Sequence, residues 1–189
     1  MQRILSLAAV MTALFAVGCG STLNEQKTTT TQSPLRDPAM LVRQGDACAA
    51  EGDFTRAQQY FAAAIAAGGD SNEILPHLLE ACIAAGDLRL ASEYAENALS
   101  RRPDDANLRF VAGALQARIG NRPAAREHLV QAAREMRSNP EVQFLVATFF
   151  RDDMQDRVVA DPYFREYLRL APRGEHAAEA RASLMEQLQ

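Results

Sequence analysis

The chain of 189 residues has no tryptophan, and aromatic residues make up only 6% of it. Alanine supplies much of the apolar share, so a core must be built from small side chains that pack closely, which favours helix on helix. Lysine is nearly absent too: Lys27 is the single one among 20 basic residues, and the arginines are scattered among 24 acidic residues. Because no basic patch is present, nucleic acid is not an expected partner. Three cysteines are too few for a disulfide scaffold.

The first hydrophobic run is too short to cross a membrane. It extends from Ile4 to Val17, after a positively charged start, whereas a spanning helix needs about 20 apolar residues. This pattern is typical of a secretory signal peptide. The run leads into Ala16-Val17-Gly18-Cys19, which resembles the lipobox of bacterial lipoproteins. The resemblance implies that residues 1–18 are removed and that Cys19 carries lipid. The alternative is a soluble periplasmic protein that is cut nearby, with Cys19 incidental.

Two features after Cys19 bear on where the protein would lie. Gly20 follows the cysteine, and no aspartate is there; in Gram-negative lipoproteins, that similarity implies the outer membrane, with the domain on the periplasmic side. Residues 19–37 include four consecutive threonines and few apolar side chains, so they are expected to form a flexible linker. Such a linker reaches at most ~60 Å when extended.

From residue 38 onward the sequence repeats itself at a constant spacing. Three copies are marked by a glycine followed by an acid or amide: Gly52-Asp53, Gly86-Asp87 and Gly120-Asn121. Glycine suits a left-handed turn where a first helix ends, and Asp or Asn caps a second helix. Alanine recurs early in each second helix, at Ala57, Ala91 and Ala125. The spacing and pattern resemble those of the tetratricopeptide repeat (TPR), which implies an all-α solenoid of helix–turn–helix units.

A fourth copy is degenerate. Residues 141–154 predict a first helix with no glycine at its end, and Ala160, Phe164 and Pro172 recover the second-helix pattern one residue out of phase. Asp161-Pro162 is compatible with a late start of that second helix. Residues 174–189 predict a final amphipathic helix that covers the last apolar face. The expected repeat domain, residues 38–189, therefore has about four repeats and a C-terminal capping helix.

No arrangement of residues indicates catalysis. The histidines, His77, His128 and His176, lie in different repeats, and none is paired with a Cys or His at metal-ligand spacing. A glycine-rich phosphate loop, a Ser–His–Asp set and a nucleophile elbow are all missing. The sequence predicts no metal, no cofactor and no enzymatic activity.

Cys48 and Cys82 are separated by one repeat period and so occupy equivalent places in successive first helices. Helices in such a stack lie about 10 Å apart, beyond the ~4.4–6.8 Å that separates the Cα atoms of a disulfide. Two buried, unpaired cysteines are expected. A disulfide formed in the oxidising periplasm is the alternative.

In the TPR family the first helices line a concave groove, and the resemblance places the partner-binding surface there. The candidate residues are Asp46, Glu73, Glu80, Phe110, Arg118, Leu145 and Phe149. They predict an acidic N-terminal end and an apolar C-terminal end, where exposed Phe110, Leu145 and Phe149, with Arg118 beside them, would anchor a partner. The alternative is that these apolar side chains pack on one another or under the capping helix. The acids depart from the basic carboxylate clamp of chaperone-binding members and favour an apolar segment flanked by Arg or Lys.

The order of parts predicts a non-enzymatic scaffold. Signal peptide, lipidated cysteine, linker and repeats follow one another in the same order in assembly lipoproteins of type IV and tight-adherence pili, which help secretins to assemble. The resemblance implies a periplasm-facing lipoprotein that binds a protein or peptide partner in its groove. The same order also fits an accessory lipoprotein of secretion, gliding motility or outer-membrane assembly. A regulator of a cell-wall enzyme and an envelope enzyme remain as alternatives from a different class.

Overall fold

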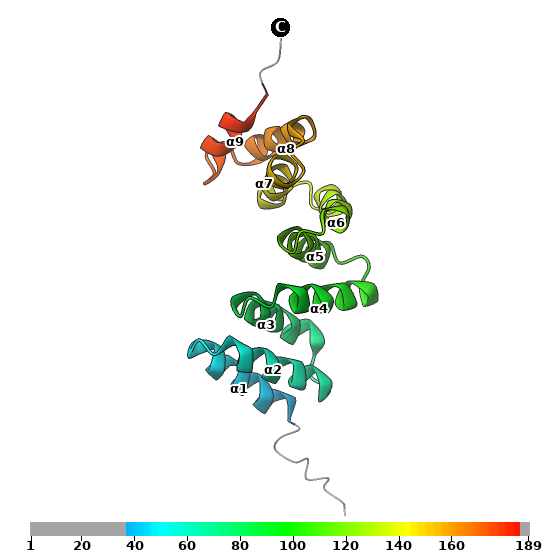
Figure 1. Ribbon diagram of the computed structural model, residues 1–189, viewed down its shortest axis with the longest axis vertical. Helices are drawn as coiled ribbons and strands as arrows, with labels where there is room; N and C mark the ends of the chain where they lie inside the picture. Colours follow the sequence, from blue (N-terminus) through cyan, green and yellow to red (C-terminus); the bar gives the residue numbers. More distant parts are fainter. Residues whose placement is uncertain (1–36, 186–189) are drawn as a thin grey trace, which may run out of the picture. The chain divides into compact units, whose positions relative to one another are not determined.

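A computed structural model describes residues 37–185, and within these residues the chain is helical with no strand. Figure 1 shows the helices following one another in chain order. They are α1 (Pro38–Ala50), α2 (Phe54–Ala66), α3 (Ser71–Ala84), α4 (Leu88–Arg101), α5 (Ala106–Arg118), α6 (Arg122–Glu135), α7 (Pro140–Thr148), the π-helical turn η2 (Phe149–Asp153), α8 (Arg157–Leu170) and α9 (Ala177–Ser183). Each helix packs mainly on its neighbours in sequence, which is the arrangement of a repeat solenoid. The predicted all-α fold is confirmed.

The predicted turn glycines end the first helices of three repeats. Gly52, Gly86 and Gly120 have φ angles of 79°, 83° and 82°, in the left-handed region that glycine adopts without a steric penalty. The residue after each glycine donates its N–H to the carbonyl five residues earlier, over 2.8–2.9 Å. This bond is the signature of a Schellman C-cap, and it explains why glycine recurs at the same place in each of these repeats.

The predicted caps of the second helices hold in only one of the three glycine-marked repeats. Asp53 accepts a hydrogen bond from the backbone N–H of Arg56 over 3.0 Å. Asp87 and Asn121 occupy the N-cap position without a side-chain cap. Asp87 accepts from Gln58 Nε2 over 2.9 Å, and Asn121 donates from Nδ2 to Gln116 Oε1 of α5 over 2.9 Å. These two side chains therefore join elements of the stack and do not cap their helices.

The predicted alanine core is present. Ala57, Ala91 and Ala125 are fully buried, and small residues at these places let paired helices approach closely. Cys48 and Cys82 are buried and unpaired. Burial raises the pKa of the Cys82 thiol to about 11, so this sulfur stays protonated and is a poor nucleophile. No helix among residues 37–185 is long and apolar enough to cross a membrane.

One extra residue in the fourth repeat lies in the π-helical turn η2. The N–H of Asp156 bonds to the carbonyl of Phe150, six residues earlier, whereas the equivalent bond in the other repeats spans five. Gln155 takes the place of the turn glycine and has a φ of 54°. The insertion accounts for the one-residue slip between the first three copies and the fourth.

The second helix of the fourth repeat starts earlier than the sequence predicted. Asp156 caps α8 by accepting the N–H of Val159 over 3.0 Å, and Pro162 lies inside the helix. The expected start at Asp161-Pro162 is wrong, because the insertion in η2 brings Asp156 to the cap position that Asp53 holds in the first repeat.

The C-terminal capping helix is shorter than predicted. It covers Ala177–Ser183 instead of residues 174–189, and residues 186–189 lie outside the described part of the chain. Ala177 and Ala180 are its buried residues. Arg151 holds the helix in place, since its guanidinium donates to Glu179 Oε1 over 2.8 Å and to Ser183 Oγ over 2.6 Å.

Replacing Gln155 by glycine is expected to raise the free energy of unfolding by about 1 kcal/mol. A residue with a Cβ loses roughly 1–2 kcal/mol in the left-handed region, and glycine does not, although its greater freedom in the unfolded chain offsets part of the gain. Urea unfolding followed by circular dichroism measures the change. Gln59→Gly, at an exposed position inside α2, is the matched control and should lower stability by about 1 kcal/mol. A loss of stability in Gln155→Gly would contradict the assignment.

Candidate functional site

Three of the predicted partner-binding residues lie together on the face made by the first helices, here called the first-helix face. Glu73, His77 and Glu80 follow one another at helical spacing on α3, and Asp46 extends from α1. The side chains of all four are exposed. His77 Nδ1 lies 3.7 Å from Asp46 Oδ1 and joins the two first helices. Three carboxylates and one histidine therefore form an acidic surface across the first two repeats.

Two cavities flank His77 on this surface. One, of about 280 Å³, is lined by Asp46, His77 and Glu80 on its polar side and by Phe61 and Ala81 among its apolar walls. The Phe61 ring, from α2, lies 5.5 Å from the His77 ring between centroids. Apolar walls beside carboxylates suit a ligand that has both aliphatic and cationic groups.

The second cavity lies at the other end of α3. It measures about 380 Å³ and is lined by Val42, Glu73, Ile74 and His77, together with residues at the start of α1. Glu73 thus lines this cavity, and Glu80 lines the first. A bound polypeptide that filled both cavities would pass His77 between the two glutamates.

The apolar C-terminal patch is not an exposed surface. Phe149 is only 2% exposed and packs edge-on against Phe150, with 5.5 Å between ring centroids. Phe110 and Leu145 are half-buried against the same core cluster. The prediction of an exposed anchor is therefore wrong for Phe149, and the alternative, packing within the core, describes it.

The prediction for Phe149 failed because of the position of the extra residue in the fourth repeat. The sequence interpretation shifted the whole fourth repeat by one residue, whereas the insertion lies in η2, after α7. Helix α7 keeps the register of the first three repeats, so Glu141, Phe144 and Thr148 occupy the places that Asn107, Phe110 and Ala114 hold in α5. The unshifted repeat period would have predicted that Phe149 is buried, because its equivalent in the third repeat, Leu115, is buried.

Phe144 is the residue that the sequence analysis missed. Its ring stacks on the His176 imidazole with 4.1 Å between centroids and 7° between planes. His176 Nε2 also lies 3.6 Å from Glu141 Oε2. The segment before α9 therefore covers Phe144, and the acidic surface near α1 and α3 is the open part of the predicted site.

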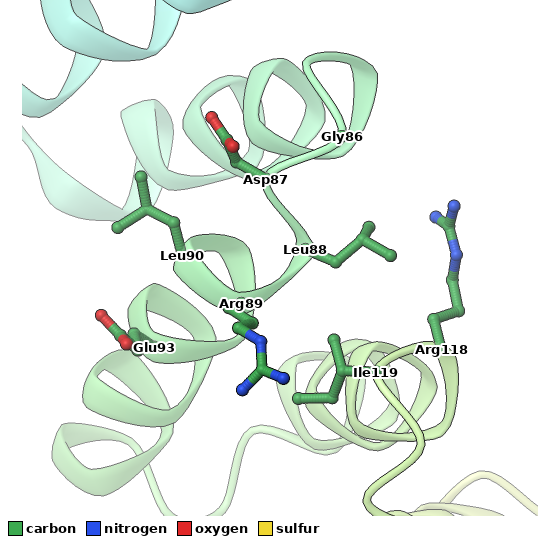
Figure 2. A pocket seen from close by; sticks show the side chains of 8 residues that line it. All are labelled: Gly86, Asp87, Leu88, Arg89, Leu90, Glu93, Arg118 and Ile119. Carbon is green, nitrogen blue, oxygen red and sulfur yellow. The ribbon is translucent and has the colours of Figure 1, made fainter.

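Arg118 lies away from the aromatic residues. It lines a cavity of about 590 Å³ at the helix–turn edge, together with Leu88, Arg89 and Ile119. In the view of Figure 2, Ile119 lies between the side chains of Arg89 and Arg118. Arg118 was expected beside Phe110, but the two residues are eight positions apart on α5. This spacing separates their Cα atoms by about 12 Å along the helix.

No group of three or more His, Cys, Asp or Glu side chains within residues 37–185 has the geometry to hold a metal ion. His128 lies 3.1 Å from Glu96, so each histidine has a carboxylate neighbour from another helix. These pairs join separate elements, and two cavities flank the one that includes His77.

Comparison with known proteins identifies the fold as that of TPR proteins. No protein-family model matches the sequence, and no curated protein matches it. Among solved structures, YrrB, a TPR protein with an unusual peptide-binding site, is 16% identical with a TM-score of 0.67, over 78% of this chain and 75% of YrrB. MamA is 17% identical with a TM-score of 0.66, over 77% of this chain and 81% of MamA. A TPR protein from Parabacteroides merdae is 17% identical with a TM-score of 0.68, over 77% of this chain and 58% of that protein.

Proposed function

We propose that the chain is a non-enzymatic adaptor that holds a partner polypeptide on the first-helix face of its first two repeats. The observation that carries the proposal is the placement of Asp46, Glu73 and Glu80 around two cavities with apolar walls. An apolar segment flanked by Arg or Lys fits this surface, because its aliphatic side chains enter the cavities while its cations meet the carboxylates. The fold shared with YrrB, whose structure has a peptide-binding site, supports the same role.

The proposed location is the periplasmic side of the outer membrane, through lipid on Cys19. This cysteine and the linker to residue 37 lie almost wholly outside the described residues, and the support comes from the lipobox-like sequence. The order of parts favours an assembly lipoprotein of an envelope machine such as a type IV pilus, a tight-adherence pilus or a secretin. An accessory role in secretion, gliding motility or outer-membrane assembly, or regulation of a cell-wall enzyme, would use the same binding surface.

Neutralising Glu73 and Glu80 together, as Glu73→Gln with Glu80→Gln, is expected to weaken binding of a cationic peptide about tenfold at low salt. The probe is a fluorescein-labelled peptide with an aliphatic centre and an arginine at each end, and fluorescence anisotropy gives its Kd. The difference between the two proteins should shrink as salt is raised through the physiological range, because both glutamates are exposed and screened.

The control for this experiment is Glu93→Gln, at an exposed position on the second helix α4. This single neutralisation should leave the Kd unchanged. If Glu93→Gln weakened peptide binding as much as Glu73→Gln or Glu80→Gln alone, only the net charge of the protein would matter. No weakening by the double variant would remove the acidic surface from the proposed function.

Replacing Cys19 by alanine is expected to release the protein from membranes and to leave the repeat domain folded. One acyl chain holds only weakly, and the several chains implied by a lipobox hold effectively permanently, at ~0.8 kcal/mol per buried methylene. Membrane fractionation with immunoblotting measures the release, and circular dichroism checks the fold. Cys48→Ala is the control and should stay in the membrane fraction. Equal membrane retention of both variants would place the anchor elsewhere.

A further inference from the structure

A further cavity of the described helices lies away from the first-helix face. It measures about 890 Å³ and runs between the second helices α2 and α4, with the N-terminal half of α3 as its floor. In Figure 1 α3 lies between α2 and α4 in the stack. Leu75 of α3 forms the floor, and Ala62 and Ile65 of α2 face Ala98 of α4. We call this cavity the α2–α4 groove.

The groove is open because of two substitutions at repeat-equivalent positions. One repeat further on, Glu96 of α4 and His128 of α6 make a polar contact at 3.1 Å that bridges the second helices. Their equivalents one repeat period earlier are Ala62 and Tyr94, and an alanine methyl group has neither the length nor the charge to make that bridge.

A second pair of positions shows the same difference. Arg109 of α5 pairs with Glu135 of α6 at 3.1 Å. Their equivalents one repeat period earlier are Leu75 and Arg101. Leu75 supplies an apolar floor instead of a cation, and Arg101 is a cation where the later repeat has an acid. The same solenoid geometry is thus closed around α5 by a polar contact from α4 to α6 and an ion pair from α5 to α6. It is left open and apolar between α2 and α4.

The polar side chains of the groove make no hydrogen bonds within the described part of the chain. The side chains of Ser71, Asn72, Tyr94 and Asn97 line it, and none makes a hydrogen bond to another described residue. Burial raises the pKa of the Tyr94 hydroxyl, so this group remains a donor at neutral pH. Amide and hydroxyl side chains beside an apolar floor match a ligand that has unpaired backbone N–H and C=O groups, as an extended peptide does and a helix does not.

The charge of the groove is positive and lies at one end. Arg101 and Arg102 follow each other at the C-terminus of α4, near Ser71 and Asn72 at the start of α3. Arg102 lies 3.3 Å from Asp105, so its charge is partly balanced, while Arg101 is exposed and has no acidic partner among residues 37–185. A carboxylate on the ligand would complete this end of the groove, as Glu135 completes the pair with Arg109.

We infer that the α2–α4 groove is a second binding surface, for an extended polypeptide segment that presents aliphatic side chains next to a carboxylate. The chemistry is opposite in charge to that of the first-helix face, which suits a cationic segment. One molecule of the adaptor therefore has two faces that select partners of opposite charge, and the second face does not depend on the function proposed for the first.

The test is a selection of peptides on the full chain. The probe is a phage-displayed library of random heptapeptides with free carboxyl termini. Besides any cationic peptides that the first-helix face selects, the enriched peptides should include a class with an aspartate, a glutamate or the terminal carboxylate within two residues of aliphatic side chains. Synthetic, labelled copies of these peptides then give Kd values by fluorescence anisotropy.

Two variants locate the binding. Ala62→Glu with Tyr94→His installs the bridge found one repeat further on and should weaken binding at least tenfold. Arg101→Glu, an exposed change that spares the core, should also weaken it at least tenfold, and a peptide with lysine in place of its acid should regain affinity for this variant. Arg89→Glu, the same charge change near the other end of α4, is the matched control and should leave binding unaltered.

Three results would overturn the inference. These are failure to enrich any peptide that has an acidic group, equal binding of such peptides by Arg101→Glu and the unaltered chain, and equal binding by the bridged variant and the unaltered chain. Loss of binding in Glu73→Gln with Glu80→Gln, but not in Arg101→Glu, would place the selected peptides on the first-helix face instead. Because those glutamates lie outside the groove, the two surfaces are tested separately.

Discussion

Replacing Gly45 by leucine is expected to lower the free energy of unfolding by about 3 kcal/mol, the upper end of the usual cost of overpacking a core. Gly45 lies in the middle of α1, where glycine is otherwise unfavourable by about 1 kcal/mol relative to alanine. A Cβ at this position would lie 2.6 Å from Cε1 of the Phe61 ring. The ring is only 2% exposed, so the clash with it outweighs the gain in helix propensity.

The repeats suggest how the same change can be tolerated. In the third repeat Gly113 meets Leu129, and a Cβ there would lie 2.9 Å from the leucine Cγ. In the second repeat the sizes are exchanged, with Leu79 on the first helix and Ala95 on the second, both buried. A large side chain thus occurs on only one of the two facing positions in each of these repeats.

Gly45→Leu combined with Phe61→Ala should therefore be more stable than the sum of the single changes predicts. Phe61→Ala alone should cost roughly 3–5 kcal/mol through the cavity it leaves, and leucine at position 45 fills part of that cavity. The expected coupling energy is about 2–3 kcal/mol in favour of the double variant, near the upper end of values for residues in contact.

Urea unfolding of the four proteins in this cycle, followed by circular dichroism of the helical signal, gives the coupling energy. Ala47→Leu, at an exposed position of α1, is the control and should change stability by about 0.5 kcal/mol or less. Additive effects of Gly45→Leu and Phe61→Ala would show that the two positions do not exchange volume.

The parts of the fold that follow from periodicity could be predicted from the sequence. The turn glycines and buried alanines recur at a fixed spacing because each repeat solves the same local problem of ending one helix and packing the next. The acidic residues Asp46, Glu73 and Glu80 could be placed on one face for the same reason. Their exposure follows from helical spacing and does not depend on long-range contacts.

The parts that failed depend on contacts between repeats. Asp87 lies at a cap position, but Gln58 from the preceding repeat binds its carboxylate, and such a partner has no signature in local sequence. The one-residue slip in the fourth repeat could be counted from the sequence, but its position could not, because any site between Asn121 and Ala160 preserves the count. The insertion is located by the hydrogen bond from the N–H of Asp156 to the carbonyl of Phe150, which spans six residues instead of five.

The location of that insertion changes what a substitution of Phe149 does. Phe149→Ala is expected to lower the free energy of unfolding by roughly 3–5 kcal/mol, because the ring is 2% exposed and its removal leaves a cavity. A loss of partner binding in this variant would follow from unfolding that spreads through the array and would not identify a contact. The conservative change Phe149→Leu copies the side chain found one repeat period earlier and should cost less than about 1.5 kcal/mol.

Comparing stability with binding in the same samples separates the two interpretations. Urea unfolding should show the large loss in Phe149→Ala and the small one in Phe149→Leu, and binding of the arginine-flanked peptide should remain native in Phe149→Leu. At a temperature where Phe149→Ala is still fully folded, its peptide binding should also be native, since Asp46, Glu73 and Glu80 lie at the other end of the array. Native stability of Phe149→Ala together with a tenfold loss of binding would instead place this ring on the accessible surface, and with it the whole fourth repeat in the shifted register.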